Sequence, residues 1–196
     1  MPKVILGITG GIASGKSTVL HMLARWGFQT VSSDDLAHHC IRKGQPAYSA
    51  ILRVFGREIL APNNEIDRRK LGTLVFASPA QRRRLEKIVH PCVAKGLLHF
   101  IQTHKGMMAL DIPLLFEARY QSWVDKIVVV YCTRAQQIKR LTRRRGLSHR
   151  QALQRIRAQM SLSRKCRQAD YVIRNTRDTN HLRKQVSLFL SHLKKA

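Results

Sequence analysis

The chain has 196 residues, 44% of them hydrophobic, which suits a globular protein with one substantial core. Its 36 Lys and Arg against 11 Asp and Glu give a formal net charge of +25, which favours polyanionic partners. No apolar run reaches the ~20 residues that a membrane span needs, and the apolar stretch after Lys3 lacks a signal peptide's cleavage region. These features exclude a membrane-spanning protein, and we expect a cytoplasmic one.

Apolar periodicity predicts an alternation of strands and helices. Residues 3–9 (K-V-I-L-G-I-T) read as a buried parallel strand, and residues 16–26 as an amphipathic helix that ends at Gly27. Further strands are predicted at 29–32, 107–110, 126–132 and 171–173. The closing helix carries an apolar seam formed by Leu182, Val186, Phe189 and Leu193. This alternation predicts an α/β fold, a five-stranded parallel sheet flanked by helices, with ligands at the carboxyl ends of the strands.

Two helical blocks interrupt this pattern. The first, at about 37–103, is far longer than a simple crossover, and the second, at about 136–168, is rich in arginine. The remaining parts, about 1–36, 104–135 and 169–196, would form the core that contains the sheet. Between Arg134 and Lys184 there are 16 basic and 2 acidic residues, and most of these side chains fit a solvated surface as well as an anion site.

The four cysteines, Cys40, Cys92, Cys132 and Cys166, are widely separated and form no C-x-x-C pair. Such spacing indicates neither a zinc knuckle nor a disulfide framework. Each is expected to be a free thiol.

The strongest motif is a glycine-rich loop. Gly10, Gly15, Lys16 and Ser17 satisfy G-x-x-x-x-G-K-[ST], the Walker A pattern, between a predicted strand and a predicted helix. Its glycines let backbone N–H groups point at a phosphate, with a helix N-terminus behind them. Lys16 supplies a charge for the terminal phosphates, and the Ser17 hydroxyl is suited to Mg²⁺. The predicted ATP-binding residues are Gly11, Ile12, Ala13, Ser14, Gly15, Lys16, Ser17 and Thr18.

Acidic residues follow two of the predicted strands. Asp34, in S-S-D-D-L-A, is a candidate general base at the sheet edge, although an N-cap of the next helix is an equal alternative. Asp111 ends the third strand, where an acid commonly lies near magnesium, and a capping role is as plausible. Glu117 could belong either to the same candidate site or to the protein surface.

Arginines of the second block fit phosphate clamping. Arg140, Arg143, Arg144 and Arg145 lie on and after a helix that follows the fourth strand. We expect two of the four to act over a closing site.

Taken together, these stretches resemble the dephospho-coenzyme A kinase family over nearly the whole chain. The matching motifs, in order, are G-I-T-G-G-I-A-S-G-K-S-T at 7–18, S-S-D-D-L-A-H at 32–38, I-D-R-R-K-L at 66–71, L-E-K-I-V-H-P at 85–91, D-I-P-L-L-F-E at 111–117, Q-I-K-R-L-T-R-R at 137–144, R-I-R-A-Q at 155–159 and A-D-Y-V-I-R-N at 169–175. Their order and spacing are more specific than any single motif.

The resemblance implies a P-loop core with a helical substrate domain and a lid, which transfers the γ-phosphoryl group of ATP to the ribose 3'-hydroxyl of dephospho-coenzyme A. It places Asp34 at the base position, Arg140 and Arg144 at lid arginines, and Asn175 near the adenine pocket. Lys16, Asp34, Arg140 and Arg144 are thus the catalytic candidates. The implied substrate side comprises Asp34, His90, Pro91, Asp111, Pro113, Leu114, Leu115 and Glu117. Without the resemblance, His90 would read as a capping or packing histidine.

The chain departs from the family pattern at several positions. Ser32 stands where an aspartate is usual, Ala13 replaces a loop glycine, Asn63 and Asn64 replace an Asp-Gly turn, and Arg145 replaces an acidic or amide residue. Ala13 is tolerable if its φ is negative, and Asn64 can adopt a left-handed turn.

Two rival functions remain open. One is a P-loop kinase acting on another nucleoside or nucleotide, and the other is a nucleic-acid-binding ATPase suggested by the charge. Against the second, the few aromatic residues are not interleaved with the basic run. We expect a monomer with Mg²⁺ as cofactor, ATP and dephospho-coenzyme A as substrates, and at most nonspecific binding to polyanions.

Overall fold

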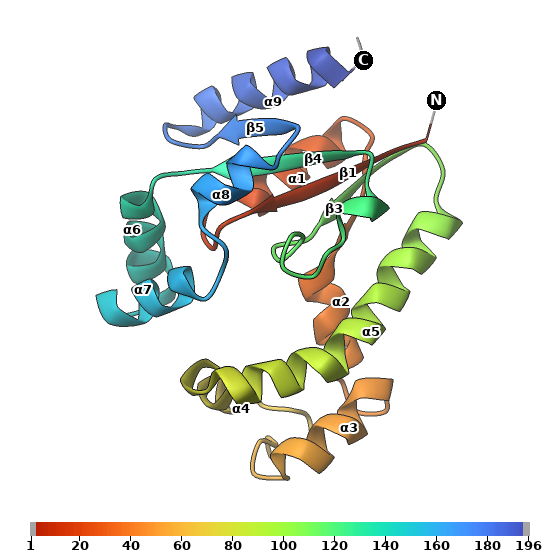
Figure 1. The fold of residues 1–196 in the computed structure, drawn as a ribbon, viewed down its shortest axis with the longest axis vertical. Coiled ribbons are helices and arrows are strands. Elements are labelled where there is room, and N and C mark those ends of the chain that lie inside the picture. Colours follow the sequence, from red (N-terminus) through yellow and green to blue (C-terminus); the bar gives the residue numbers. More distant parts are fainter. Residues whose placement is uncertain (1–2, 194–196) are drawn as a thin grey trace. The chain divides into compact units, whose positions relative to one another are not determined.

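The computed structural model describes residues 3–193, apart from the side chains of Phe76, Arg144 and Arg145 (Figure 1). Internal contacts divide the chain into two compact units. The sheet unit comprises the residues up to Val31 together with those from His104 onward, and the helical unit comprises Ser32–Thr103.

The five predicted strands are confirmed, with ends that differ by one residue from the prediction or not at all. They are β1 (Val4–Gly10), β2 (Gln29–Ser32), β3 (Met107–Asp111), β4 (Lys126–Tyr131) and β5 (Tyr171–Arg174). Their order is β2-β3-β1-β4-β5, and β1 pairs in parallel with both β3 and β4. The central strand β1 therefore leads directly into the glycine-rich loop.

The core of the sheet unit forms where α1 (Lys16–Arg25) and α9 (Thr179–Leu193) pack on the strands (Figure 1). The predicted seam of α9 is confirmed, since Leu182, Val186 and Phe189 are buried and Leu193 packs against the same cluster. The cluster also contains Leu6 and Ile8 of β1. Burial of this apolar area is the main force that holds β1, and hence the loop after it, in place.

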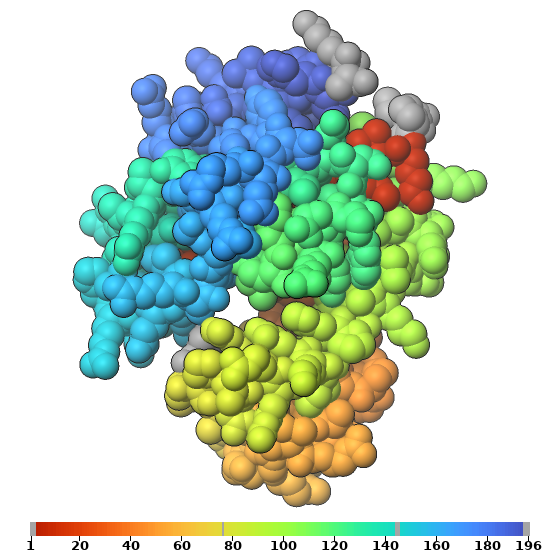
Figure 2. Space-filling view, viewed as in Figure 1, coloured from red at the N-terminus to blue at the C-terminus, as the bar shows by residue number. Residues whose placement is uncertain are grey.

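Three further helices follow β4 in the sheet unit. They are α6 (Arg134–Arg145), α7 (His149–Arg157) and α8 (Leu162–Arg167), and a 3₁₀ turn, η1, spans Gln121–Trp123. Each α-helix begins at a hydroxyl cap, because Thr133, Ser148 and Ser161 accept backbone N–H groups. Figure 2 shows α6, α7 and α8, coloured teal to blue, on the face in view. Within residues 3–193 no helix has the length and apolarity needed to cross a bilayer.

The helical unit contains α2 (Ser33–Cys40), α3 (Pro46–Phe55), α4 (Arg68–Ala77) and α5 (Pro79–Thr103). Its core is built around Ile51, Phe55, Ile59 and Leu71. Asp67 caps α4 by accepting the N–H groups of Arg69 and Lys70, and these hydrogen bonds lower the pKa of its carboxyl group. The unit thus has its own apolar core.

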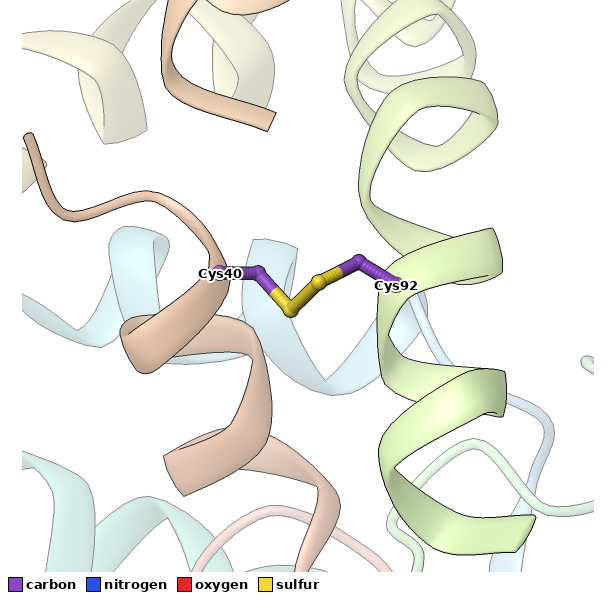
Figure 3. Close-up of a disulfide and its surroundings, with 2 residues drawn as sticks. All are labelled: Cys40 and Cys92. Carbon is purple, nitrogen blue, oxygen red and sulfur yellow. A yellow bond between two sulfur atoms is a disulfide. The ribbon is translucent and has the colours of Figure 1, made fainter. Parts of the chain in front are cut away.

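The expectation of four free thiols is wrong for two cysteines. Cys40, at the end of α2, forms a disulfide with Cys92 of α5 (Figure 3). The two are 52 residues apart in the sequence, and they meet because α2 packs on α5, which no local spacing reveals. Cys132 and Cys166 are free thiols, as expected, and burial raises the pKa of each.

Reduction of the disulfide is expected to destabilise the helical unit. A bridge that closes a loop of this length restricts the unfolded chain, and its loss typically costs about 2–4 kcal/mol. The measurement is urea unfolding followed by circular dichroism, with and without dithiothreitol. The control is the Cys40→Ser/Cys92→Ser variant, whose midpoint should not respond to reductant. An identical wild-type midpoint in both conditions would contradict the expectation.

Candidate active site

The glycine-rich loop joins β1 to α1. Gly15 occupies the N-cap of α1 with a φ of 99° and forms no side-chain cap. The Thr18 N–H donates to the Gly15 carbonyl at 3.1 Å, so the N–H groups of Lys16 and Ser17 are those suited to an anion at this helix N-terminus. Ser14 is buried and its N–H donates to the Gly11 carbonyl at 3.1 Å, whereas Ser17 and Thr18 are exposed. The predicted loop therefore has the geometry of a phosphate cradle.

Arg140 and Asn175 brace this loop from two different elements. The Arg140 guanidinium donates through Nη1 to the carbonyl oxygens of Ala13 (3.1 Å) and Ser14 (3.2 Å), and through Nη2 to that of Asn175 (3.1 Å). The Asn175 Nδ2 donates to the Ser14 carbonyl at 2.8 Å. Both residues thus lie at the loop, and their hydrogen bonds fix its backbone.

Two glutamines that were not singled out from the sequence hold the same loop. The Gln159 Oε1 accepts the Ile12 N–H at 2.9 Å, while the buried Gln137 donates from Nε2 to the Ile12 carbonyl at 2.7 Å. The N–H and the carbonyl group of Ile12 are therefore both hydrogen-bonded by side chains. A signal was present, since Gln137 and Gln159 lie in motifs that carry the family resemblance.

Ala13 adopts a left-handed conformation with a φ of 59°, so the condition of a negative φ is not met. An alanine Cβ is strained there, whereas glycine is not. The left-handed turn expected at Asn64 is confirmed, with a φ of 61°.

Ala13→Gly is expected to raise the free energy of unfolding by about 0.5–1 kcal/mol, because glycine relieves the strain at a positive φ. The matched control is Ala24→Gly in α1, exposed and helical, which should lower stability by about 1 kcal/mol. Urea unfolding of both variants checks the sign. A destabilised Ala13→Gly would mean that the left-handed conformation is not strained.

The segment Asp111–Glu117 lies beside the end of β1. Asp111 pairs in register with Ile8, and the Ile112 N–H donates to the Ile8 carbonyl at 2.9 Å. The Thr9 Oγ1 donates to the Pro113 carbonyl at 3.1 Å. Pro113 and Leu115 are buried and Leu114 is half-buried, so these apolar side chains pack in the protein interior.

Ser17 and Asp111 are the candidate magnesium ligands. They lie at the start of α1 and the end of β3, at the same carboxyl edge of the sheet, and both offer oxygen donors. Among residues 3–193 no group of three or more His, Cys, Asp and Glu side chains could hold a metal. The oxygen donors of Ser17 and Asp111 are of the type that Mg²⁺ binds, usually together with water and substrate phosphates.

Asp34 lies in the first turn of α2, in the helical unit. The N-cap of this helix is Ser32, whose Oγ accepts the Asp35 N–H at 3.2 Å, so the capping alternative for Asp34 is wrong. The Asp34 side chain is exposed. Ser32, the departure from the family pattern, thus has a local structural role that leaves Asp34 available for chemistry.

His90 and Pro91 lie in the interior of α5, in the same unit as Asp34. His90 is half-buried, and Pro91 is exposed inside the helix. A proline there cannot donate to the carbonyl four residues earlier, which leaves one backbone acceptor of α5 available.

The remaining predicted arginines lie on α6. Arg143 is exposed, and the side chains of Arg144 and Arg145 lie outside the part that the structure describes. Of the four, Arg140 alone has described contacts with the loop.

A parallel α/β sheet whose central strand runs through a braced glycine-rich loop into a helix N-terminus defines a P-loop nucleotide-binding protein. The family model described as "Dephospho-CoA kinase" matches residues 4–181. The chain belongs to the dephospho-CoA kinase family, and it is therefore a phosphotransferase of coenzyme A biosynthesis.

Curated relatives of this chain carry the same family name. A dephospho-CoA kinase of Carboxydothermus hydrogenoformans is 44% identical over 194 residues, which cover 97% of this chain and 94% of the relative. One of Geobacillus kaustophilus is 42% identical, with 94% of each chain covered. Matches of this extent include both the sheet unit and the helical unit.

Solved structures support the same conclusion. A Thermus thermophilus protein superposes with a TM-score of 0.83 at 32% identity, covering 98% of this chain and 99% of that one. Dephospho-CoA kinase from Campylobacter jejuni gives 0.71 at 28% identity, with 98% of each chain covered. A shikimate kinase from Acinetobacter baumannii, at 17% identity and 0.54, shares the fold, covering 98% of this chain and 93% of that one.

Proposed function

We propose that the chain transfers the γ-phosphoryl group of ATP to the ribose 3'-hydroxyl of dephospho-coenzyme A, which gives coenzyme A and ADP. The observation that carries this proposal is the glycine-rich loop, a phosphate cradle braced by Arg140 and Asn175, in a chain that belongs to the dephospho-CoA kinase family. Lys16 and the N-terminus of α1 favour the triphosphate electrostatically.

In the proposed mechanism the transfer is in line. Lys16, Arg140 and Arg144 stabilise charge on the transferred group, and Asp34 accepts the proton of the attacking hydroxyl. Ser17, with Asp111 as a second ligand, would hold Mg²⁺, which supplies charge neutralisation at the phosphates. Asn175 would lie by the adenine.

We assign the acceptor to a substrate region that includes His90, Pro91 and the segment Asp111–Glu117. The helical block at about 37–103 would bind dephospho-coenzyme A, and the block at about 136–168 would act as a lid over the nucleotide. The length of the first block and the arginines of the second support these roles.

The test is ADP release with magnesium ATP, measured with and without dephospho-coenzyme A, with the product identified by mass. The expected result is acceptor-dependent ADP release and a product heavier by one phosphoryl group. Phosphorylation of a nucleoside in preference to dephospho-coenzyme A, or ATP hydrolysis stimulated by RNA, would overturn the proposal in favour of one of the two rivals.

We also propose that the protein acts in the cytoplasm as a monomer, with no specific nucleic-acid partner. Its charge of +25 supports nonspecific association with polyanions. Added salt should weaken any such association, because screening shortens the range of surface charges.

A further inference from the structure

Lys165 of α8 is fully buried. Among the side chains that the structure describes, Lys165 is the only charged one that is buried. Burying an ammonium group costs free energy unless hydrogen bonds and an opposite charge compensate. Since buried ion pairs often add little net stability, the contacts of Lys165 suggest a role in placing its partners.

Those partners belong to the segment after β3. The Lys165 Nζ donates to the Pro113 carbonyl at 2.7 Å and lies 3.1 Å from Glu117 Oε1 and 3.2 Å from Glu117 Oε2. The Pro113 carbonyl also accepts from Thr9, which precedes the glycine-rich loop. Lys165 thus bonds to both ends of residues 113–117, and Thr9 joins the first end to β1.

The electrostatic environment of Lys165 is consistent with its burial beside Glu117. Burial lowers the pKa of the Lys165 ammonium group, and the Glu117 carboxylate opposes that change. The charge of Lys16 also acts on Lys165, so the buried ammonium lies within electrostatic reach of the Walker lysine.

The residues just before Lys165 hold the glycine-rich loop itself. Gln159 accepts the Ile12 N–H, and the next residue, Met160, donates its N–H to Glu117 Oε1 at 2.9 Å. Residues 159–165, here called the bridge segment, therefore contact the loop through Gln159 and residues 113–117 through Met160 and Lys165.

We propose that the bridge segment carries two positioning residues of the kinase, with Gln159 setting the glycine-rich loop for ATP and Lys165 setting residues 113–117 for the acceptor. This inference rests on the proposed function, which assigns residues 113–117 to the acceptor side. The two contacts would act on different substrates, because Gln159 bonds to the glycine-rich loop whereas Lys165 bonds to residues 113–117.

The test is steady-state kinetics of Lys165→Met and Gln159→Leu, which keep side-chain length or size and remove the hydrogen bonds. Loss of a hydrogen bond to a charged group is expected to raise the KM for dephospho-coenzyme A about tenfold in Lys165→Met, with the KM for ATP within about threefold. Gln159→Leu should show the reverse pattern. Matched controls are the exposed Lys184→Met and the half-buried Gln185→Leu, both of α9, which should leave both KM values unchanged.

The inference is overturned if the two KM values rise together in each variant, stay at the wild-type values, or change in the opposite pairing. If Lys165→Met does not fold, Lys165→Met/Glu117→Gln replaces it, because no unpaired charge then remains at the pair. That double variant should retain the raised KM for the acceptor, and a wild-type value would overturn the role of Lys165.

The wild-type enzyme, assayed in parallel, separates the two proposals. Turnover of dephospho-coenzyme A by the wild type upholds the proposed function whatever the variants show. Failure of the wild type with this acceptor rejects the proposed function, and the inference on the bridge segment with it.

Discussion

Asp34→Asn is expected to lower kcat by a factor on the order of 10² to 10⁴ while ATP affinity stays within about twofold. The amide has nearly the shape of the carboxylate but cannot accept the proton of the acceptor hydroxyl. The helix should remain intact, because Ser32 and not Asp34 caps α2. The measurement is single-turnover kinetics together with ATP binding by calorimetry.

The neighbouring Asp35 provides a matched control. Asp35 is also exposed in the first turn of α2, so Asp35→Asn removes the same favourable charge from the helix N-terminus. Turnover of this control should stay within about threefold of the wild type, since the removed charge is worth less than about 1 kcal/mol. Near-normal turnover in Asp34→Asn would remove Asp34 as the base.

Gly15→Ala is expected to weaken ATP binding by a factor on the order of 10², through backbone strain and steric conflict together. Gly15 has a φ of 99°, and a Cβ there would collide with the Asn175 amide nitrogen that donates to Ser14. The substitution must therefore displace either the loop or the Asn175 side chain that donates to it. Calorimetric titration with magnesium ATP measures the loss.

Gly27→Ala separates strain from collision. Gly27 has a similar φ of 88°, but a Cβ there would meet nothing within 4 Å. This control should lose about 1 kcal/mol of stability and bind ATP normally. Wild-type ATP affinity in Gly15→Ala would mean that the Asn175 amide can move aside without harm to the loop.

Much of the sheet unit could be predicted from the sequence, because its determinants are local. The apolar runs at residues 3–9 and 126–132 indicate strands that are buried on both faces. The seam from Leu182 to Leu193 indicates a helix that is buried on one face. The glycine-rich loop was also predictable, since its motif lies between a strand and a helix.

Features that depend on tertiary packing could not be predicted in this way. The Cys40–Cys92 bridge requires α2 to lie on α5, and the contacts of Lys165 join residues 48 and 52 positions apart. From the sequence, Lys165 is expected to be one more residue of a solvated basic run, because no neighbouring residue indicates that it is buried. Likewise, the positive φ of Ala13 is imposed by the loop and not by alanine.

The disulfide makes residues 40–92 a covalent ring that contains α3 and α4. A protease that cuts once inside this ring, for example at the exposed Arg68, Arg69 or Lys70, leaves both products joined through sulfur. The nicked protein would migrate as one species on a denaturing gel without reductant and as two fragments with it. A single band without reductant is therefore no proof of an intact backbone in this part of the chain.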